Sequence, residues 1–498
     1  MTNETTGRVC FIIPPSVFLL DERVFMTLGV LKVAAVVEKL TPVDVLDLSG
    51  VENYEEVVRD YVASADTEVF GITATTPQMP AVSRIVEVIR TTHPSGRVIL
   101  GGPHGTLLHA ARRLECKKGV MGRASRSFSE LEEMFDVIVA GDGEIAIHQA
   151  IGHNLHRVID ADDPKTEFFL KDEQLDELPW PARHLVEVDS YHYSIEGKRA
   201  LSLITQLGCP FNCGFCGGRN SPFLRRVRMR SIGNVLGEVE HLHRKYGVDG
   251  FMFYDDELNV NRAIVQMMHG LEEMQDRLGV EFQLRGFIKA QLFTDEQAEA
   301  MYNAGFRWIL VGFESGSPRI LWNINKRATR EENSRCMEIA KRHGLKVKTL
   351  MSIGHPGESE ETVMDTHRWL LEVEPEDFDV TIITVYPGSP YYDEAVSHPS
   401  LPGVWVYTYG GDNLYSVEVD YRLTAEYYKG DPNEGYQAFV YTDLLSSERI
   451  VELRDFVERD VRKRLGIPFN PSALALRYEH SMGQSGVLPA YILRKGGV

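Results

Sequence analysis

Short apolar runs alternate with helical patterns through the first 150 residues. Apolar, β-branched runs predict strands at residues 8–13, 43–48, 69–75, 97–100 and 136–140. Apolar residues at helical spacing predict helices between several of them, at 28–40, 55–63 and 82–89. Strands that alternate with helices indicate an α/β domain with a doubly wound, Rossmann-like parallel sheet.

The same alternation returns further along the chain. Strands are predicted at residues 201–206, 250–254, 281–286, 308–312, 345–353 and 379–385. Helices are predicted at 234–246, 262–278, 295–303, 331–343 and 361–373. Six strand–helix units predict a partial (β/α)6 barrel of the TIM type, in which chemistry occurs at the C-terminal ends of the strands.

The pattern is weaker in two other segments. Residues 151–177 show no sustained period, and Leu178-Pro-Trp-Pro-Ala182 has a backbone that proline fixes, so an ordered connector is expected. The segment after 395 is rich in tyrosine and has one amphipathic helix, at 446–465. Its tyrosines could cover a flat substrate or form a small core. We therefore expect a first domain at 1–150, a connector at 151–195, a barrel at 196–395 and a small α+β, substrate-associated domain at 396–498.

Composition narrows the classes of function. The 498 residues are 43% hydrophobic and 25% charged, which is typical of a soluble globular protein, and the net charge of −19 disfavours binding to nucleic acid. Six cysteines in a chain of this length do not make a disulfide framework. Neither a signal peptide nor an apolar run long enough to cross a membrane is apparent, so a cytoplasmic location is expected.

Three cysteines lie close together directly after the first barrel strand. Cys209, Cys213 and Cys216 are separated by three and then two residues, and thiolates favour soft metals and iron–sulfur clusters. A cubane cluster usually takes four cysteines, so three would leave one iron open to a substrate. A zinc knuckle and three buried thiols are the alternatives.

Polar and glycine-rich motifs follow the other predicted strands. In the barrel these are Asp255-Asp-Glu257, Glu314-Ser315, Gly354-His-Pro-Gly-Glu358 and Tyr386-Pro387. In the first domain they are Thr73-Ala-Thr75, Gly101-Gly-Pro-His-Gly105 and Gly141-Asp-Gly-Glu144. A carboxylate at a strand end can bind an ammonium group or ribose hydroxyls, and glycine allows a ligand to approach the backbone closely. Each acidic residue alone could instead be a solvated helix cap, Glu358 especially.

The cysteine run, with Phe215 before its last cysteine, resembles the signature of the radical S-adenosylmethionine (SAM) superfamily. The glycine-rich turns upstream resemble the cobalamin-binding domain of one class of these enzymes, the class B radical SAM methyltransferases. The resemblance implies a 4Fe–4S cluster on the three cysteines, with SAM on the open iron. It implies SAM contacts at Phe215, Asp255, Asp256, Glu257, Glu314, Ser315, Lys326, Gly354 and Tyr386. It implies cobalamin contacts at Thr73, Thr75, Gly101, Gly102, Pro103, His104, Gly105, Gly141, Gly143 and Glu144.

Two positions stay open. Lys326 could reach the SAM carboxylate or be a surface lysine. Cobalamin mutases have an Asp-x-His-x-x-Gly motif whose histidine binds cobalt, whereas the comparable loop here, Asp21 to Met26, has Arg23 and no histidine. We expect no histidine below the metal from this loop, and we expect Arg23 to be a solvated surface residue. His104 is a second candidate ligand, although capping of a turn is the simpler role.

The resemblance implies an enzyme that uses SAM twice, once to methylate cobalamin and once to form a 5′-deoxyadenosyl radical. Such an enzyme would methylate an unactivated carbon of a small molecule and would take electrons from an external donor of the flavodoxin or ferredoxin type. Binding to a membrane or to nucleic acid is not expected. The alternative with the same motifs is a cyclase or ring-rearranging enzyme without net methyl transfer. A cobalamin-binding sensor and a tRNA-modifying enzyme are less favoured, because of the cysteine motif and the acidic charge respectively.

Overall fold

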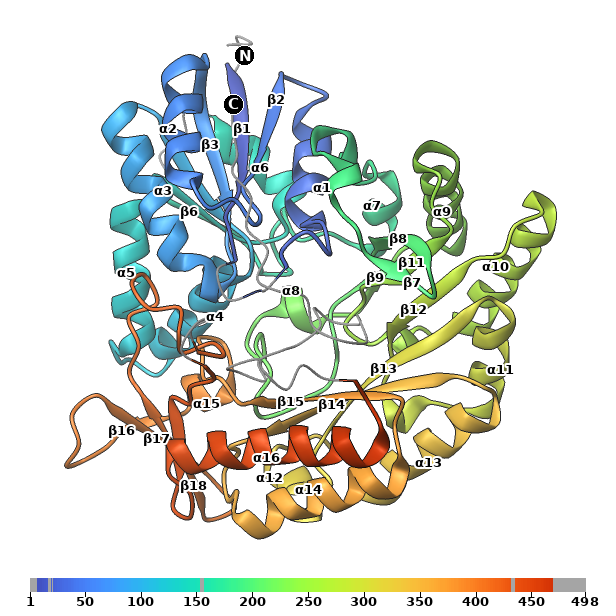
Figure 1. The fold of residues 1–498 in the computed structure, drawn as a ribbon. Coiled ribbons are helices and arrows are strands. Elements are labelled where there is room, and N and C mark those ends of the chain that lie inside the picture. Colours follow the sequence, from blue (N-terminus) through green and yellow to red (C-terminus); the bar gives the residue numbers. More distant parts are fainter. Residues whose placement is uncertain (1–6, 17–18, 20, 153–155, 431–434, 469–498) are drawn as a thin grey trace.

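The computed structural model describes residues 7–16, 19, 21–152, 156–430 and 435–468 (Figure 1). Six parallel strands form the first sheet, in the order β2-β1-β3-β4-β5-β6. Their bounds are β1 Arg8–Ile13, β2 Val43–Asp47, β3 Thr67–Thr73, β4 Arg97–Gly101, β5 Val137–Gly141 and β6 Val158–Ala161. Because helices cover both faces, the central strands are apolar on both sides, and this explains their continuous hydrophobic runs. The predicted doubly wound sheet is confirmed.

Helices connect the strands of this sheet. They are α1 Leu28–Val37, α2 Tyr54–Ser64, α3 Met79–Thr92, α4 Pro103–Lys117, α5 Arg123–Met134 and α6 Gly143–Ile151. α1 packs beside α6, and α2 beside α3, so the sheet is a layer between two helical layers (Figure 1). All six strands of this parallel sheet have their carboxyl ends at one edge, toward the centre of the molecule (Figure 1).

The segment without a sustained sequence period, residues 151–177, contains two elements. β6 pairs with β5 and extends the first sheet to Ala161, and α7 (Asp172–Glu177) follows. The sequence pattern predicted neither of them. β6 is a four-residue edge strand that contains Asp160, so it has too few apolar residues to give a pattern.

The second sheet is a partial barrel of six parallel strands with a short antiparallel strand at one edge, in the order β15-β14-β13-β12-β11-β8-β7. The strands are β7 Ser194–Ile195, β8 Lys198–Leu203, β11 Gly250–Phe253, β12 Gln283–Phe287, β13 Phe306–Glu314, β14 Lys346–Ile353 and β15 Asp377–Ile382. The outer helices are α9 Ile232–Tyr246, α10 Ile264–Leu278, α11 Asp295–Asn303, α13 Arg330–Arg342 and α14 Glu360–Val373. Side chains of Ser231, Thr294 and Thr329 cap three of these helices. The predicted partial barrel is confirmed.

Small elements lie between the two sheets and around the cysteine loop. They are β9 Gln206–Leu207, β10 Arg228–Met229, α8 Pro222–Arg225, α12 Pro318–Asn323 and α15 Pro390–Asp393. β9 and β10 pair as a two-stranded antiparallel sheet.

The last segment packs against the open edge of the barrel. Strands β16 Val396–Ser397, β17 Val404–Tyr409, β18 Asp412–Val417 and β19 Val440–Thr442 form an antiparallel sheet. Helix α16 (Ser447–Leu465) crosses the edge beside α14 and β15 (Figure 1). Its buried Arg462 pairs with Asp377 of β15 at 3.1 Å, so the edge strand is covered by a charged but paired interface. The part of the predicted C-terminal domain after residue 468 lies outside the described residues.

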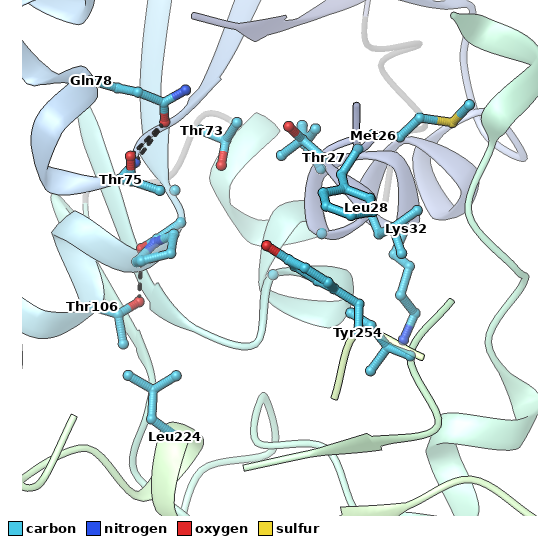
Figure 2. Close-up of a pocket in the computed structure, with 18 of the residues that line it drawn as sticks. Met26, Thr27, Leu28, Lys32, Thr73, Thr75, Gln78, Thr106, Leu224 and Tyr254 are labelled. Carbon is cyan, nitrogen blue, oxygen red and sulfur yellow. Dashed lines mark hydrogen bonds between the residues drawn. The ribbon is translucent and has the colours of Figure 1, made fainter. Parts of the chain in front are cut away.

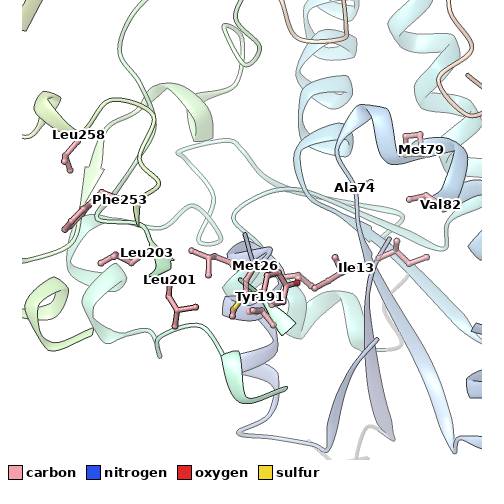
Figure 3. Close-up of a cluster of buried hydrophobic side chains, with 14 of the residues drawn as sticks. Ile13, Met26, Ala74, Met79, Val82, Tyr191, Leu201, Leu203, Phe253 and Leu258 are labelled. Carbon is pink, nitrogen blue, oxygen red and sulfur yellow. The ribbon is translucent and has the colours of Figure 1, made fainter. Parts of the chain in front are cut away.

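The two large sheets share an apolar core. Figure 3 shows Ile13 and Ala74 of the first domain on one side, and Leu203 and Phe253 of the barrel on the other, with Met26 and Tyr191 between them. This continuous packing fixes how the two sheets face each other. Among the described helices, not one is long and apolar enough to cross a membrane.

Candidate active site

A cavity of about 1020 Å³ lies between the carboxyl edges of the two parallel sheets. Thr73, Gly101 and Gly141 reach it from strand ends of the first sheet, and Tyr254 and Glu314 reach it from strand ends of the barrel. Figure 2 shows the phenol of Tyr254 reaching toward Thr73 and Thr27 of the first domain. Strand ends at a topological switch point and at a barrel mouth are the places where such folds bind ligands.

Eight of the ten residues that we associate with cobalamin line this cavity. They are Thr73, Thr75, Gly101, Gly102, Pro103, Gly141, Gly143 and Glu144. At Gly102, φ is +90° and an added Cβ would lie 2.6 Å from Oγ1 of Thr73, so only glycine fits. At Gly101 an added Cβ meets nothing within 4 Å, so this backbone is open to a ligand. The wall therefore fits a broad ligand that contacts backbone.

The other two residues of this set do not line the cavity. His104 is 2% exposed, and its Nδ1 lies 3.1 Å from Oγ1 of Thr76. Burial lowers the pKa of His104 to about 4, so the imidazole is neutral. Gly105 packs on Leu100 within the domain. The described residues that line the cavity include no histidine.

Arg23 is buried, so the expectation of a solvated surface residue is wrong. Its side chain forms an ion pair with Asp47, and its Nε donates to the carbonyl oxygen of Ser49 at 3.1 Å. The guanidinium also lies 4.9 Å from the ring centre of Tyr191. The buried charge of Arg23 is stable because each nitrogen of its guanidinium group has a hydrogen-bond partner.

The cysteine loop is held by backbone contacts from several elements. The N–H of Gly214 donates to the carbonyl oxygen of Ile324 at 2.6 Å. Nη1 of Arg219 donates to the carbonyl oxygens of Asn212 and Cys213, at 2.6 and 3.2 Å. At Gly208, φ is +82° and a Cβ would lie 2.3 Å from the carbonyl oxygen of Arg226. The loop therefore has a defined structure. Any other residue in place of Gly208 would force the neighbouring backbone to shift.

The three thiols belong to one loop and lie within eight residues of the sequence. Cys209 and Cys213 are partly buried and Cys216 is exposed. Burial raises the pKa of the Cys209 thiol to about 11, and the negative charges of Glu257 and Asp256 add to this. Bound iron would reverse the effect, since a metal ion favours the thiolate.

Three cysteines on one loop are a donor set that an iron–sulfur cluster can use. Within the described part of the chain, no three His, Cys, Asp or Glu side chains are grouped as a metal site. A cubane cluster takes one thiolate at each of several irons. The donor set, three thiols on a glycine-rich loop, suits that group.

A buried ion pair stands at the barrel rim. Nζ of Lys326 lies 2.8 Å from Oε1 of Glu314, and Ser352 donates to the other carboxylate oxygen at 2.8 Å. Lys326 is 5% exposed and is paired with Glu314, which lines the cavity, so it is not a surface lysine. Burial raises the pKa of Glu314, but the Lys326 ammonium outweighs it and the net shift is downward. The carboxylate is therefore ionised, and φ of Glu314 is +67°, a strained conformation that is common at functional sites.

The three acidic residues after β11 have different surroundings. Asp255 is 2% exposed, and its Oδ1 accepts N–H bonds from Thr205 and Gln206 at 2.8 and 2.6 Å. It anchors the chain that leads into the cysteine loop. Asp256 lines the cavity and is exposed to it. Burial raises the pKa of Glu257 to about 7, although Lys326 and Lys289 oppose the shift. Asp256 is the carboxylate best placed to meet an ammonium group.

The remaining residues predicted to contact SAM differ in their position relative to the cavity. Tyr386 lines the cavity, and Gly217 approaches it so closely that a Cβ would lie 2.9 Å from its ring. Phe215 lies at the rim, with its ring centre 5.9 Å from Nζ of Lys326. Ser315 is 1% exposed and its hydroxyl lies 3.1 Å from Oγ1 of Thr366, within the protein. At Gly354, φ is +88° and the N–H donates to Glu358 at 3.1 Å. Glu358 is 1% exposed, so it is not a solvated helix cap.

Sequence reasoning missed other residues at this site. Lys289 follows β12, is 3% exposed, and places Nζ 4.5 Å from the ring centre of Phe211 in the cysteine loop. Burial and the neighbouring Lys326 lower its pKa. His355 lies between Ser352 and Tyr391, at 2.8 and 3.0 Å. The signal for Lys289 was its place just after a strand, which alone is weak.

The tyrosines of the last segment have two kinds of surroundings. Tyr427 and Tyr428 line the cavity together with Lys429. Tyr421 and Tyr436 are buried in the core. The segment therefore contributes both to the wall of the cavity and to its support.

Comparisons with known proteins agree with this architecture. Residues 203–370 match the family model of the Radical SAM superfamily, and residues 22–132 match that of the B12 binding domain. An uncharacterized methyltransferase of Pyrococcus horikoshii is 26% identical over 413 residues, which are 79% of this chain and 84% of that protein. The anaerobic magnesium-protoporphyrin IX monomethyl ester cyclase of Rubrivivax gelatinosus is 24% identical over 356 residues, 68% of this chain and 60% of the cyclase.

Among solved structures, the radical S-adenosylmethionine methyltransferase TsrM from Kitasatospora setae, with cobalamin and a [4Fe-4S] cluster bound, has the same fold. The TM-score is 0.62 at 17% identity, and the match covers 91% of each chain. The chain combines a B12 binding domain with a radical SAM domain.

Proposed function

We propose that this cobalamin-binding radical SAM enzyme is a methyltransferase that acts on an unactivated carbon of a small molecule. One observation carries the proposal: the glycine-rich edge of the first sheet and the charged mouth of the barrel face each other across one cavity. A substrate between them would lie within reach of both cofactors, and such proximity is worth several orders of magnitude in rate.

Each wall has residues suited to one cofactor. Cys209, Cys213 and Cys216 would hold the 4Fe–4S cluster. Asp256 would bind the ammonium of SAM, and Glu314, fixed by Lys326, would face its ribose. On the opposite wall the turns at Gly101–Gly102 and Gly141–Gly143 would receive cobalamin without a histidine ligand. When bound, the cluster supplies the electron that cleaves SAM and cobalamin carries the methyl group.

The rest of the chemistry depends on how the chain surrounds the reactants. The apolar cavity wall excludes water, which protects a reactive radical from side reactions. The overall stoichiometry is as follows. One substrate molecule with its C–H bond, two molecules of SAM and two electrons give one C-methylated product, one 5′-deoxyadenosine, one methionine and one S-adenosylhomocysteine. The electrons come from an external low-potential donor of the flavodoxin or ferredoxin type.

Methyl-deuterated SAM tests the proposal. The label is expected intact in the product, with one 5′-deoxyadenosine and one S-adenosylhomocysteine per methyl group transferred. The ring cyclase among the relatives favours a second candidate, ring formation without net methyl transfer. Altered product with 5′-deoxyadenosine but neither label nor S-adenosylhomocysteine would contradict methyl transfer and support that candidate.

A further inference from the structure

The loop between β1 and α1 leaves the first domain and enters the barrel. Val24 belongs to an apolar cluster whose other buried members come from the barrel, such as Met252 of β11 and Leu310 of β13, and from the end of the connector that leads into it. Phe25 packs against the same cluster, with its ring centre 4.5 Å from that of Tyr193 and 5.2 Å from that of Tyr254. Two first-domain side chains therefore fill the interior of the partial barrel.

Polar contacts fix both sides of this insertion. Oδ2 of Asp21 lies 2.6 Å from Nε2 of His192, and the N–H of His192 donates to the carbonyl oxygen of Arg23 at 3.1 Å. Arg23 also donates to the hydroxyl of Ser190 at 3.2 Å. His192 and Ser190 belong to the connector that leads into β7. The loop is thus bound to the barrel side by its backbone, its charges and its apolar side chains.

The same loop forms part of the cavity wall. Val24 and Phe25 line the cavity, as do Thr27 and Leu28 at the start of α1, whereas Arg23 does not. Arg23 instead makes its buried pair with Asp47, behind the wall. A change in how Phe25 packs would therefore move the edge of the first domain relative to the barrel mouth.

We propose that residues 21–25 form an interdomain clasp, in which Phe25 is a positioning residue that sets the cobalamin-binding edge against the barrel mouth. The inference rests on the proposed function only in taking cobalamin as the ligand of that edge. It also explains why this loop offers no cobalt ligand: the side chain at position 23 is directed to Asp47 and Tyr191, away from the cavity.

The test uses the full-length protein with hydroxocobalamin and SAM as separate probes, so it needs no substrate. In Phe25→Ala the dissociation constant for hydroxocobalamin, from absorbance titration, is expected to rise about 10-fold or more. Formation of 5′-deoxyadenosine from SAM alone under reducing conditions should change less than about threefold, because it needs only the barrel. His192→Ala, which cuts the clasp outside the cavity, should weaken cobalamin binding a few-fold. Phe456→Ala, an exposed aromatic residue on α16, is the matched control.

A second arm tests the direction of position 23. In Arg23→His, the electron paramagnetic resonance spectrum of cob(II)alamin is expected to show no nitrogen splitting from an axial ligand. Clear splitting would overturn the clasp geometry, as would unchanged cobalamin affinity in both Phe25→Ala and His192→Ala. If Phe25→Ala does not fold, Phe25→Leu and His192→Ala decide the matter by the same titration. Absence of methyl transfer would contradict the proposed function without affecting these binding results.

Discussion

The two walls of the cavity differ in the kind of contact that they offer a ligand. The first-domain wall presents backbone at Gly101 and Gly102, apolar side chains from α1, and an ion pair between Lys32 and Glu144 at 3.3 Å. The barrel wall presents charged side chains: Asp256, and Glu314 with its buried partner Lys326 at 2.8 Å. A broad, largely uncharged macrocycle is held by shape and by many small contacts, whereas a small zwitterion is held by a few strong ones. Single substitutions should therefore have larger effects on the barrel wall than on the first-domain wall.

The largest effect is expected at the cysteine loop. Replacing Cys209, Cys213 and Cys216 together with Ala should remove the iron–sulfur absorbance and abolish reductive cleavage of SAM, because the thiolates are the ligands that the loop offers. Iron content and 5′-deoxyadenosine measure the two outcomes. Cys116→Ala, which removes an exposed thiol elsewhere, should change neither. Full reconstitution of iron in the triple variant would show that the cluster assignment is wrong.

The next effect is expected at the charged rim. Lys326→Met leaves Glu314 buried and without its counter-charge, so the carboxylate is expected to become protonated or to move. SAM affinity should then fall about 100-fold, which corresponds to about 3 kcal/mol. Equilibrium dialysis with labelled SAM measures it, and cobalamin affinity should change less than about twofold. Lys346→Met removes an exposed lysine that pairs with Glu196, at the opposite end of the barrel strands, and serves as the control. Equal loss of both ligands would mean that the two walls are not separable as described.

Some features of the fold and of the cavity walls can be predicted from the sequence, and others cannot. The parallel strands gave long apolar runs because they are buried on both faces, so both large sheets were predictable, whereas the short edge strand β6 was not. Glycine turns and cysteines could be placed because their conformational and chemical roles follow from residue type. The burial of Lys326 and Arg23 could not be predicted from the sequence. Their partners, Glu314 and Asp47, are 12 and 24 residues away in sequence, and only the fold brings each pair together. Lys289 was missed for the same reason.

A smaller effect is expected on the first-domain wall. Gly102→Ala places a Cβ 2.6 Å from Oγ1 of Thr73 and forces alanine to φ near +90°, so the turn must shift. Hydroxocobalamin affinity should fall about 10-fold, which corresponds to about 1.4 kcal/mol, while SAM affinity is retained. Gly119→Ala is the matched control, since φ is +69° there but an added Cβ meets nothing within 4 Å. Unchanged cobalamin affinity in Gly102→Ala would place cobalamin away from this turn.

The smallest effect concerns the buried carboxyl of Glu358, which supports the charged wall without lining the cavity. Burial raises its pKa from 4.5 to about 7, although hydrogen bonds from Thr362 and Gly354 oppose the shift. A carboxyl with a raised pKa in the folded state stays protonated there while the unfolded chain ionises. Its contribution to the free energy of unfolding is therefore present below pH 4.5 and is lost as the pH rises toward 7.

Glu358→Gln should remove this dependence, because a neutral amide can accept the N–H of Gly354 and donate to the hydroxyl of Thr362. The variant is expected to melt about 1–3 °C above the parent protein at pH 8 and within about 1 °C of it at pH 5. Thermal melts at the two pH values measure the difference, and Glu360→Gln, an exposed carboxylate two residues away, should melt like the parent at both. A variant that is less stable at pH 8 than at pH 5, relative to the parent, would show that Glu358 is ionised in the folded protein and that the rim carries one more buried charge.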